Sequence, residues 1–192
     1  KRADMTRYEL FLRETRTYEI IEDVKNFRSE IGVLFLNSYN RDVLTKMFDD
    51  NRLTYTSLFK ARPHIFVSKS NPLAKHEVVS LEDLEEFPYL SYDQGIHNSF
   101  YYSEEILSQI PHKKSIVVSD RATLFNLLIG LDGYTIATGI LNSNLNGDNI
   151  VSIPLDIDDE IDIVYLKHEK ATLSKMGEKF LDNLVKEVTF DN

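Results

Sequence analysis

The six residues IGVLFL (Ile31–Leu36) form an uninterrupted apolar run with polar residues on both sides. An apolar run this short predicts a strand that is buried on both faces, as in a parallel sheet. Before it, apolar side chains between Ile20 and Phe27 recur at helical spacing, and Thr17 can cap the start of that helix. Earlier still, Tyr8–Arg13 alternates polar and apolar side chains, which predicts another strand. The chain therefore opens with a strand, a helix and a strand.

The same order of elements continues downstream. A helix is expected over residues 41–50, and a β-prone stretch follows from Thr54 to Ser68. Pro63 interrupts this stretch, and because proline cannot donate to a sheet ladder, we expect the chain to leave one sheet there and enter another. The further expected elements are a short helix that starts with a capping box at Ser80 and Asp83 and ends at Pro88, strand 89–92, helix 99–109, strand 115–118, helix 121–131, strand 134–138, a return loop over 141–148, strands 150–154 and 161–167, and a C-terminal helix.

This alternation of strands and helices predicts an α/β fold with mostly parallel sheets and helices on both faces. Because the chain crosses twice between two such units, we expect two Rossmann-like lobes joined by two crossing strands, with a ligand cleft between the lobes. Lobe I is expected to comprise residues 1–63 and 150–192, and lobe II residues 64–149.

The composition limits the classes of function. The chain has 192 residues and 42% hydrophobic content, and no apolar run approaches the roughly 20 residues of a membrane span. It contains no cysteine, which excludes disulfides and thiolate sites and fits a reducing, cytoplasmic compartment. Its net charge of −9 argues against a nucleic-acid surface, because phosphate binding depends on clustered Lys and Arg. We therefore expect no membrane contact, and another segment must supply any contact with DNA.

Several short motifs along the chain carry a family resemblance. They are Glu30–Val33, Asn71–Ala74, Leu81–Leu84 with Pro88, and Val118–Ser119 followed by Leu124, Leu128, Gly130 and Gly133–Ala137. In order and spacing they resemble the effector-binding domain of LysR-type transcriptional regulators, which has the type 2 periplasmic binding protein fold. The resemblance implies a small-molecule effector, a homodimer or homotetramer, and DNA binding only through an N-terminal winged helix-turn-helix domain that these residues lack.

The resemblance also implies that the N-terminal part of lobe I is truncated, because the family's domain begins with a strand and a helix upstream of Tyr8. A sheet that starts at Tyr8 lacks its inner neighbour, and an exposed strand edge invites pairing with another chain. We therefore expect residues outside this sequence, or a second chain, to cover that edge.

Candidate ligand-binding residues lie in four loops that each follow an expected strand. Ligands of open α/β sheets bind outside the carboxyl ends of strands, where loops and helix N-termini present free N–H groups. The candidates are Asn37, Ser38 and Tyr39 in the first loop, Gln94, Asn98 and Ser99 in the second, Ser119, Arg121 and Thr123 in the third, and Thr138 and Gly139 in the fourth. A small metabolite, anionic or amino-acid-like, that bridged these loops would hold the two lobes together.

Some of these residues also have a purely structural interpretation. Ser119, Asn98 and Ser99 are residue types that commonly cap helices. Arg121 either neutralises an anionic ligand, pairs with Asp120 or lies in water. The aromatic run at residues 100–102 either lines the cleft or packs in the core or against a second subunit.

The sequence lacks the patterns of common catalytic and metal sites. Its five histidines are scattered, and no cofactor motif is present. The acidic stretch Asp156–Asp162 lacks the glycine and spacing of a calcium loop, and we interpret it as a solvated hairpin tip. We therefore expect a ligand sensor and no enzyme, metal or cofactor. The alternatives are an extracytoplasmic solute-binding protein of a transporter and an enzyme on the same fold, with Asp93 or Asp120 as its acid or base.

Overall fold

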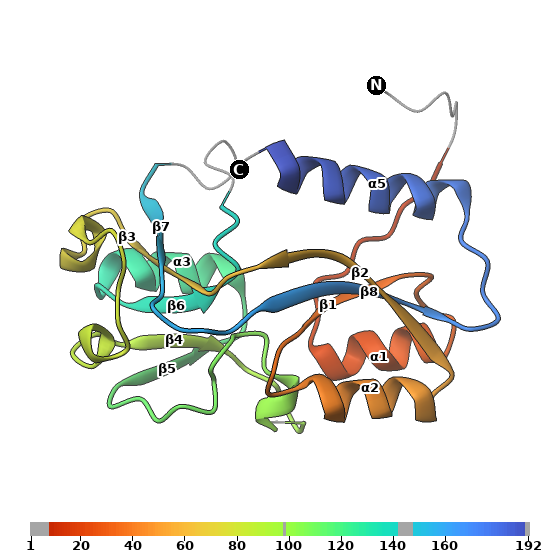
Figure 1. The fold of residues 1–192 in the computed structure, drawn as a ribbon, viewed down its shortest axis with the longest axis horizontal. Coiled ribbons are helices and arrows are strands. Elements are labelled where there is room, and N and C mark those ends of the chain that lie inside the picture. Colours follow the sequence, from red (N-terminus) through yellow and green to blue (C-terminus); the bar gives the residue numbers. More distant parts are fainter. Residues whose placement is uncertain (1–7, 98, 142–147, 191–192) are drawn as a thin grey trace.

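The computed structural model describes residues 8–97, 99–141 and 148–190, which form two sheets flanked by helices (Figure 1). The strands are β1 (Gly32–Leu36), β2 (Leu53–Ala61), β3 (His64–Ser68), β4 (Tyr89–Tyr92), β5 (Ser115–Val118), β6 (Tyr134–Ala137), β7 (Ile150–Pro154) and β8 (Ile161–His168). The α-helices are α1 (Thr17–Lys25), α2 (Arg41–Asp50), α3 (Arg121–Gly130) and α5 (Lys175–Phe190), and short 3-10 helices cover Pro72–Lys75, Glu82–Leu84 and Phe100–Tyr102.

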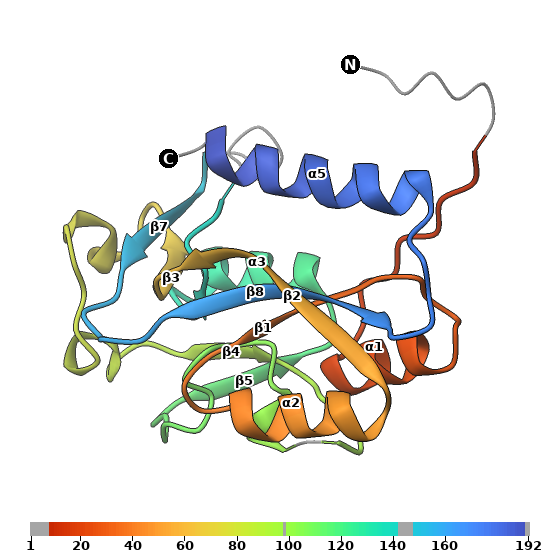
Figure 2. The same ribbon diagram turned by 45° about the vertical axis from the view of Figure 1, so that its right-hand side comes forward.

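The three-stranded sheet of lobe I has the order β1-β8-β2. Helices α1 and α2 cover one face, and α5 lies on the opposite side, as the two views in Figures 1 and 2 show. The expected apolar run of β1 alternates in burial, and its fully buried residues join side chains of α1, α2 and β8 in one core. This core consists of Ile21, Val24, Leu34, Leu36, Leu44, Phe48, Leu53, Val164 and Leu166.

The five-stranded sheet of lobe II has the order β5-β4-β6-β3-β7. Helix α3 packs through Leu124 and Leu128 against a cluster that includes Leu90 of β4 and Phe66 of β3. A second core cluster contains Ile65 and Val67 of β3, and Ile161 at the start of β8 belongs to it as well. The two lobes therefore share buried side chains where the chain crosses between them.

The two crossings lie at residues 62–63 and 155–160, between strands of different sheets. The first agrees with the expected role of Pro63. The second differs from the expectation, because β7 pairs with β3 in the five-stranded sheet, so that residues 150–154 lie with lobe II rather than with lobe I. The loop after β6 does not return the chain to the first sheet, because β7 first adds to the free edge of β3.

The expectation of mostly parallel sheets was wrong for the described residues. In lobe I, β8 runs antiparallel to both β1 and β2, because it returns from lobe II between them. In lobe II, β3 is antiparallel to β6 and β7, and β4 alone makes parallel ladders, with β5 and β6. The strands that follow the two crossings, β3 and β8, therefore run antiparallel to their neighbours. Local patterns along the chain do not reveal this direction.

The expected strand at Tyr8–Arg13 is also absent. This segment pairs with no described strand, and Phe11 is 81% exposed. Alternation alone does not make a strand, because a strand needs a neighbour to accept and donate its backbone hydrogen bonds. An apolar groove of about 420 Å³ lies between this segment, β1 and α5, and among the described residues β1 has a strand partner only in β8.

Helix boundaries differ from expectation at two further places. Helix α1 starts at Thr17 itself, with Arg16 as the preceding cap residue and no side-chain cap, and it ends at Lys25, so that Phe27 lies in a turn with φ of 57°. Residues 99–109 form a single 3-10 turn at Phe100–Tyr102 and no α-helix, and Leu107 adopts a left-handed φ of 61°, which a regular right-handed helix does not contain. No helix among the described residues is both long and apolar enough to cross a membrane.

Candidate ligand-binding site

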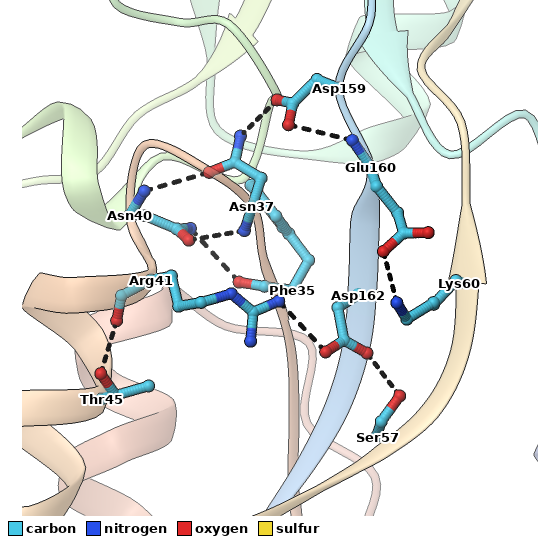
Figure 3. Close-up of polar contacts among 10 residues, drawn as sticks. All are labelled: Phe35, Asn37, Asn40, Arg41, Thr45, Ser57, Lys60, Asp159, Glu160 and Asp162. Carbon is cyan, nitrogen blue, oxygen red and sulfur yellow. Dashed lines mark hydrogen bonds and ion pairs between the residues drawn. The ribbon is translucent and has the colours of Figure 1, made fainter.

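The loop after β1 is organised by Asn37, which is buried. Its Oδ1 accepts hydrogen bonds from the backbone N–H groups of Tyr39 (3.1 Å) and Asn40 (3.0 Å), and its Nδ2 donates to Asp159 (3.3 Å; Figure 3). Asn40 returns a bond, since its Oδ1 accepts from the N–H of Asn37 at 2.9 Å. Asn37 therefore fixes the loop and ties it to the second crossing, whereas Ser38 is exposed.

The acidic stretch Asp156–Asp162 is not a hairpin tip, because β7 and β8 belong to different sheets. Asp162 is only 6% exposed and accepts hydrogen bonds from Ser57 and from Arg41 (Figure 3). Glu160 pairs with Lys60 across the same crossing. The carboxylates of this stretch hold the second crossing strand against lobe I, and solvent faces only part of them.

Aromatic rings of the loop after β4 contact lobe I. Tyr101 stacks on Tyr39 with ring centroids 4.9 Å apart, and Tyr18 of α1 stacks on His97 at 3.6 Å. Tyr102 donates to the sulfur of Met47 in α2 at 3.6 Å. The aromatic run thus joins the two lobes, and Tyr102 packs against the core of lobe I, in agreement with the core interpretation that the sequence left open.

The most direct polar link between the lobes is the side chain of Arg16, at the start of α1. Its Nε donates to the backbone carbonyl of Asp93 (2.9 Å), and a terminal nitrogen donates to the Asp93 carboxylate (2.7 Å). Its other terminal nitrogen lies 3.5 Å from Glu19. Gly95 allows this approach, because a Cβ there would lie 2.7 Å from the guanidinium. The sequence reasoning missed Arg16, although it follows an expected strand and precedes a helix, as the chosen loops do.

Two adjoining cavities flank Arg16. One, of about 280 Å³, is lined by Ser119 and Arg121 from the start of α3 and by Thr15 and Arg16 from the start of α1. The other, of about 470 Å³, is lined by Gln94 and His97 beside Arg16. The structure therefore brings candidates of the second and third loops close to Arg16, between the lobes.

The start of α3 is capped by Asp120 and not by Ser119. The Asp120 carboxylate accepts bonds from the backbone N–H of Thr123 (2.8 Å) and from its hydroxyl (2.7 Å). These bonds hold the pKa of Asp120 below its usual value. The hydroxyl of Thr123 is thus already used inside the helix cap, Ser119 is exposed in the cavity, and Arg121 lies over the ring of Phe125 at 5.0 Å.

Two adjacent glutamates, Glu104 and Glu105, were not chosen from the sequence, and the first of them lines the smaller cavity. Glu105 is 4% exposed and accepts a hydrogen bond from the backbone N–H of Tyr92, and burial raises its pKa to about 7. Glu104 lines the cavity, accepts a bond from Gln94 Nε2 (3.3 Å), and also has a pKa raised by burial. Burial raises the pKa of Tyr92 to about 12, so its hydroxyl stays protonated.

The remaining candidates lie elsewhere or have structural roles. Gly139 has φ of 82° and packs on the ring of His64, and its carbonyl accepts from the hydroxyl of Ser152 (3.2 Å). Thr138 is half-buried in the same strand end and lines neither cavity beside Arg16. Ser99 caps the 3-10 turn, and Asn98 lies outside the described residues.

No group of three or more His, Asp or Glu residues in the described part of the chain is arranged to hold a metal ion. The polar contacts around this site are helix caps, loop hydrogen bonds, ion pairs with the acidic stretch and the lobe-bridging bonds of Arg16. What the arrangement offers a small molecule is hydrogen bonds and charge from both lobes at once.

Comparisons with known proteins identify the fold and the family. A model of the LysR substrate binding domain matches residues 2–189, and a search of curated protein sequences found no match. HinK, a LysR family transcriptional regulator from Pseudomonas aeruginosa, superposes with a TM-score of 0.62 at 15% identity over 92% of this chain and 59% of its own. The chain thus spans little more than half the length of that regulator.

Two solved effector-binding domains have the same fold. The domain of QuiR, in complex with shikimate, has a TM-score of 0.61 at 17% identity over 91% of this chain and 79% of its own. The domain of BenM, with its effector benzoate, has a TM-score of 0.60 at 18% identity over 92% of this chain and 76% of its own. These structures share the two-lobed type 2 periplasmic binding protein fold, and because the family model covers nearly every residue, the chain belongs to the LysR substrate binding domain family.

Proposed function

We propose that this domain senses a small metabolite between its two lobes and passes the resulting closure to the DNA-binding part of a transcription regulator. The observation that carries the proposal is the pair of cavities around Arg16, lined by residues of both lobes. A ligand that contacts both lobes binds the closed arrangement more tightly and so shifts the population toward it. The shikimate and benzoate complexes of QuiR and BenM support a small-molecule effector.

We further propose the following organisation for the whole protein. Lobe I is formed by residues up to 63 and from 155 onward, and lobe II by the residues between them. The protein acts in the cytoplasm as a homodimer or homotetramer, and a segment outside these 192 residues binds DNA, since the net charge here is −9. Residues upstream of Lys1, or a second copy, cover the outer edge of β1.

The family match favours this function over a transporter's solute-binding protein. We also propose that the domain is not an enzyme. The two acids that the sequence offered for catalysis have structural partners: Asp93 pairs with Arg16, and Asp120 caps α3.

Thermal-shift screening of the intact protein tests the proposal. The panel comprises amino acids, their acetylated and sulfur-containing relatives, diamines and small anions. At least one compound is expected to raise the melting temperature in a concentration-dependent manner, because binding to the folded state alone stabilises it. A panel in which no compound stabilises the protein would count against a small-molecule sensor.

A further inference from the structure

The smaller cavity beside Arg16 is lined mainly by acidic ionisable groups. Its carboxyl groups belong to Glu14, Glu19, Asp93, Glu104 and Asp120, and its guanidinium groups to Arg16 and Arg121. This excess of carboxyl groups bears on the chemical class of the ligand, because a partly desolvated site favours a ligand whose charge is opposite to that of its lining.

Each of the two helix starts at this cavity already has a carboxylate close to it. Asp120 accepts the backbone N–H of Thr123 at the start of α3. At the start of α1, Glu19 lies in the first turn, and the hydroxyl of Thr15 donates to it. A second anion from a ligand would meet negative charge at both helix ends, although helix N-termini otherwise attract anions.

Gln94 provides an independent indication. Its side chain is 7% exposed, and its Nε2 donates to Glu104, which orients the amide toward that carboxylate. Its Oε1 is buried and has no hydrogen-bond partner among the described residues. Gln94 lines the larger cavity and Glu104 the smaller one, so the bond between them lies where the two cavities adjoin. An unpaired buried acceptor is costly, so a donor with several N–H groups that reached both cavities would satisfy Gln94 Oε1 and the Glu104 carboxylate.

The protein itself places a cation beside Asp93, in the lining of the cavity that Glu104 also lines. The Arg16 guanidinium of lobe I binds the carboxylate and carbonyl of Asp93 of lobe II, against Gly95. A positively charged group with several N–H donors therefore already links the two lobes. Charge-assisted hydrogen bonds of this kind are stronger than bonds between neutral groups.

We propose that the ligand of this site carries a primary amine or guanidinium group, which binds the Glu104 carboxylate and the Gln94 amide oxygen. The group lies beside the Arg16–Asp93 pair and adds a second cationic bridge between the lobes. This inference rests on the proposed function, since it names the ligand class of the same inter-lobe site.

Isothermal titration calorimetry of the full-length protein with a charge-inverted set of probes tests the inference. Putrescine and agmatine supply amine and guanidinium groups, and succinate has four carbons like putrescine but opposite charge. Glu104→Gln keeps the shape and the acceptor for Gln94 but removes the charge, and Gln94→Met removes the unpaired oxygen. Glu178→Gln, at an exposed position of α5, is the matched control for nonspecific attraction to an acidic protein.

Binding of at least one of the two amines is expected, with dissociation constants about tenfold or more higher in Glu104→Gln and in Gln94→Met but unchanged in Glu178→Gln. Binding of neither amine, equal binding to wild type and Glu104→Gln, or binding of succinate alone would overturn the inference. If another compound of the thermal-shift panel binds while both amines fail, the sensor function stands and the ligand class is wrong. If nothing binds, both fail.

Discussion

At the scale of single residues, Glu105 couples folding to pH. Its pKa is about 7 in the folded protein because of burial, whereas an unfolded glutamate titrates near its usual value of 4.5. The folded state therefore binds this proton more tightly, so the stabilisation is fully present below about pH 4.5 and is lost as the pH rises through about 7. Glu105→Gln keeps an acceptor for the Tyr92 N–H but cannot ionise.

Urea unfolding at pH 5 and pH 8 measures this effect. The free energy of unfolding of Glu105→Gln minus that of wild type is expected to be larger at pH 8 than at pH 5, by on the order of 1–3 kcal/mol. Glu178→Gln should show no such change between the two pH values. A Glu105→Gln difference that is the same at both pH values would show that Glu105 is not held protonated by burial.

Gly139 is required by both its backbone and its neighbour. Its φ of 82° is unfavourable for other residues, and a Cβ there would lie 2.5 Å from the His64 ring. Gly139→Ala is expected to lower the free energy of unfolding by roughly 1–3 kcal/mol. The control is Gly130→Ala, at the end of α3, where a Cβ meets nothing within 4 Å. It should be neutral or stabilising by up to about 1 kcal/mol, and equal effects in urea unfolding would refute the distinction.

At the scale of the element, Asp120 rather than Ser119 caps the start of α3. Both residue types accept bonds at helix starts, so the sequence could not decide between them, and only the structure shows the Asp120 carboxylate on the Thr123 N–H. Asp120→Ala is expected to cost about 1 kcal/mol of unfolding free energy, and Ser119→Ala less than half of that. Chemical denaturation of the two variants checks this. A larger loss in Ser119→Ala would reassign the cap.

Most elements could be predicted from the sequence, and the failures share one cause. The helices over residues 17–25, 41–50 and 121–130 follow from apolar spacing, which is local information. The failures, a strand at Tyr8–Arg13 and a helix at 99–109, depend on distant partners: the first has no described strand beside it, and in the second Glu105 bonds back to Tyr92. Local propensity is a weak guide where such long-range bonds decide.

At the scale of the whole molecule, the two lobes and the first crossing at Pro63 followed from the order of elements. Strand direction did not, because the place of β8 between β1 and β2 is set by contacts between residues 100 or more positions apart. The candidate site was found only in part for a similar reason. Loops after strands indicated Gln94, Ser119 and Arg121, whereas Glu104 comes from a segment expected to be helical.

The central claim is that a small molecule fixes the angle between the lobes. Because the chain has no cysteine, spin labels can be attached uniquely at Asp49→Cys on α2 and Asn126→Cys on α3, both exposed and on different lobes. Electron–electron resonance then measures the distance distribution between them, with and without a saturating amount of the most stabilising compound from the thermal-shift panel. The distribution is expected to narrow and shift to a single distance on binding, whereas an identical distribution in both samples would contradict the claim.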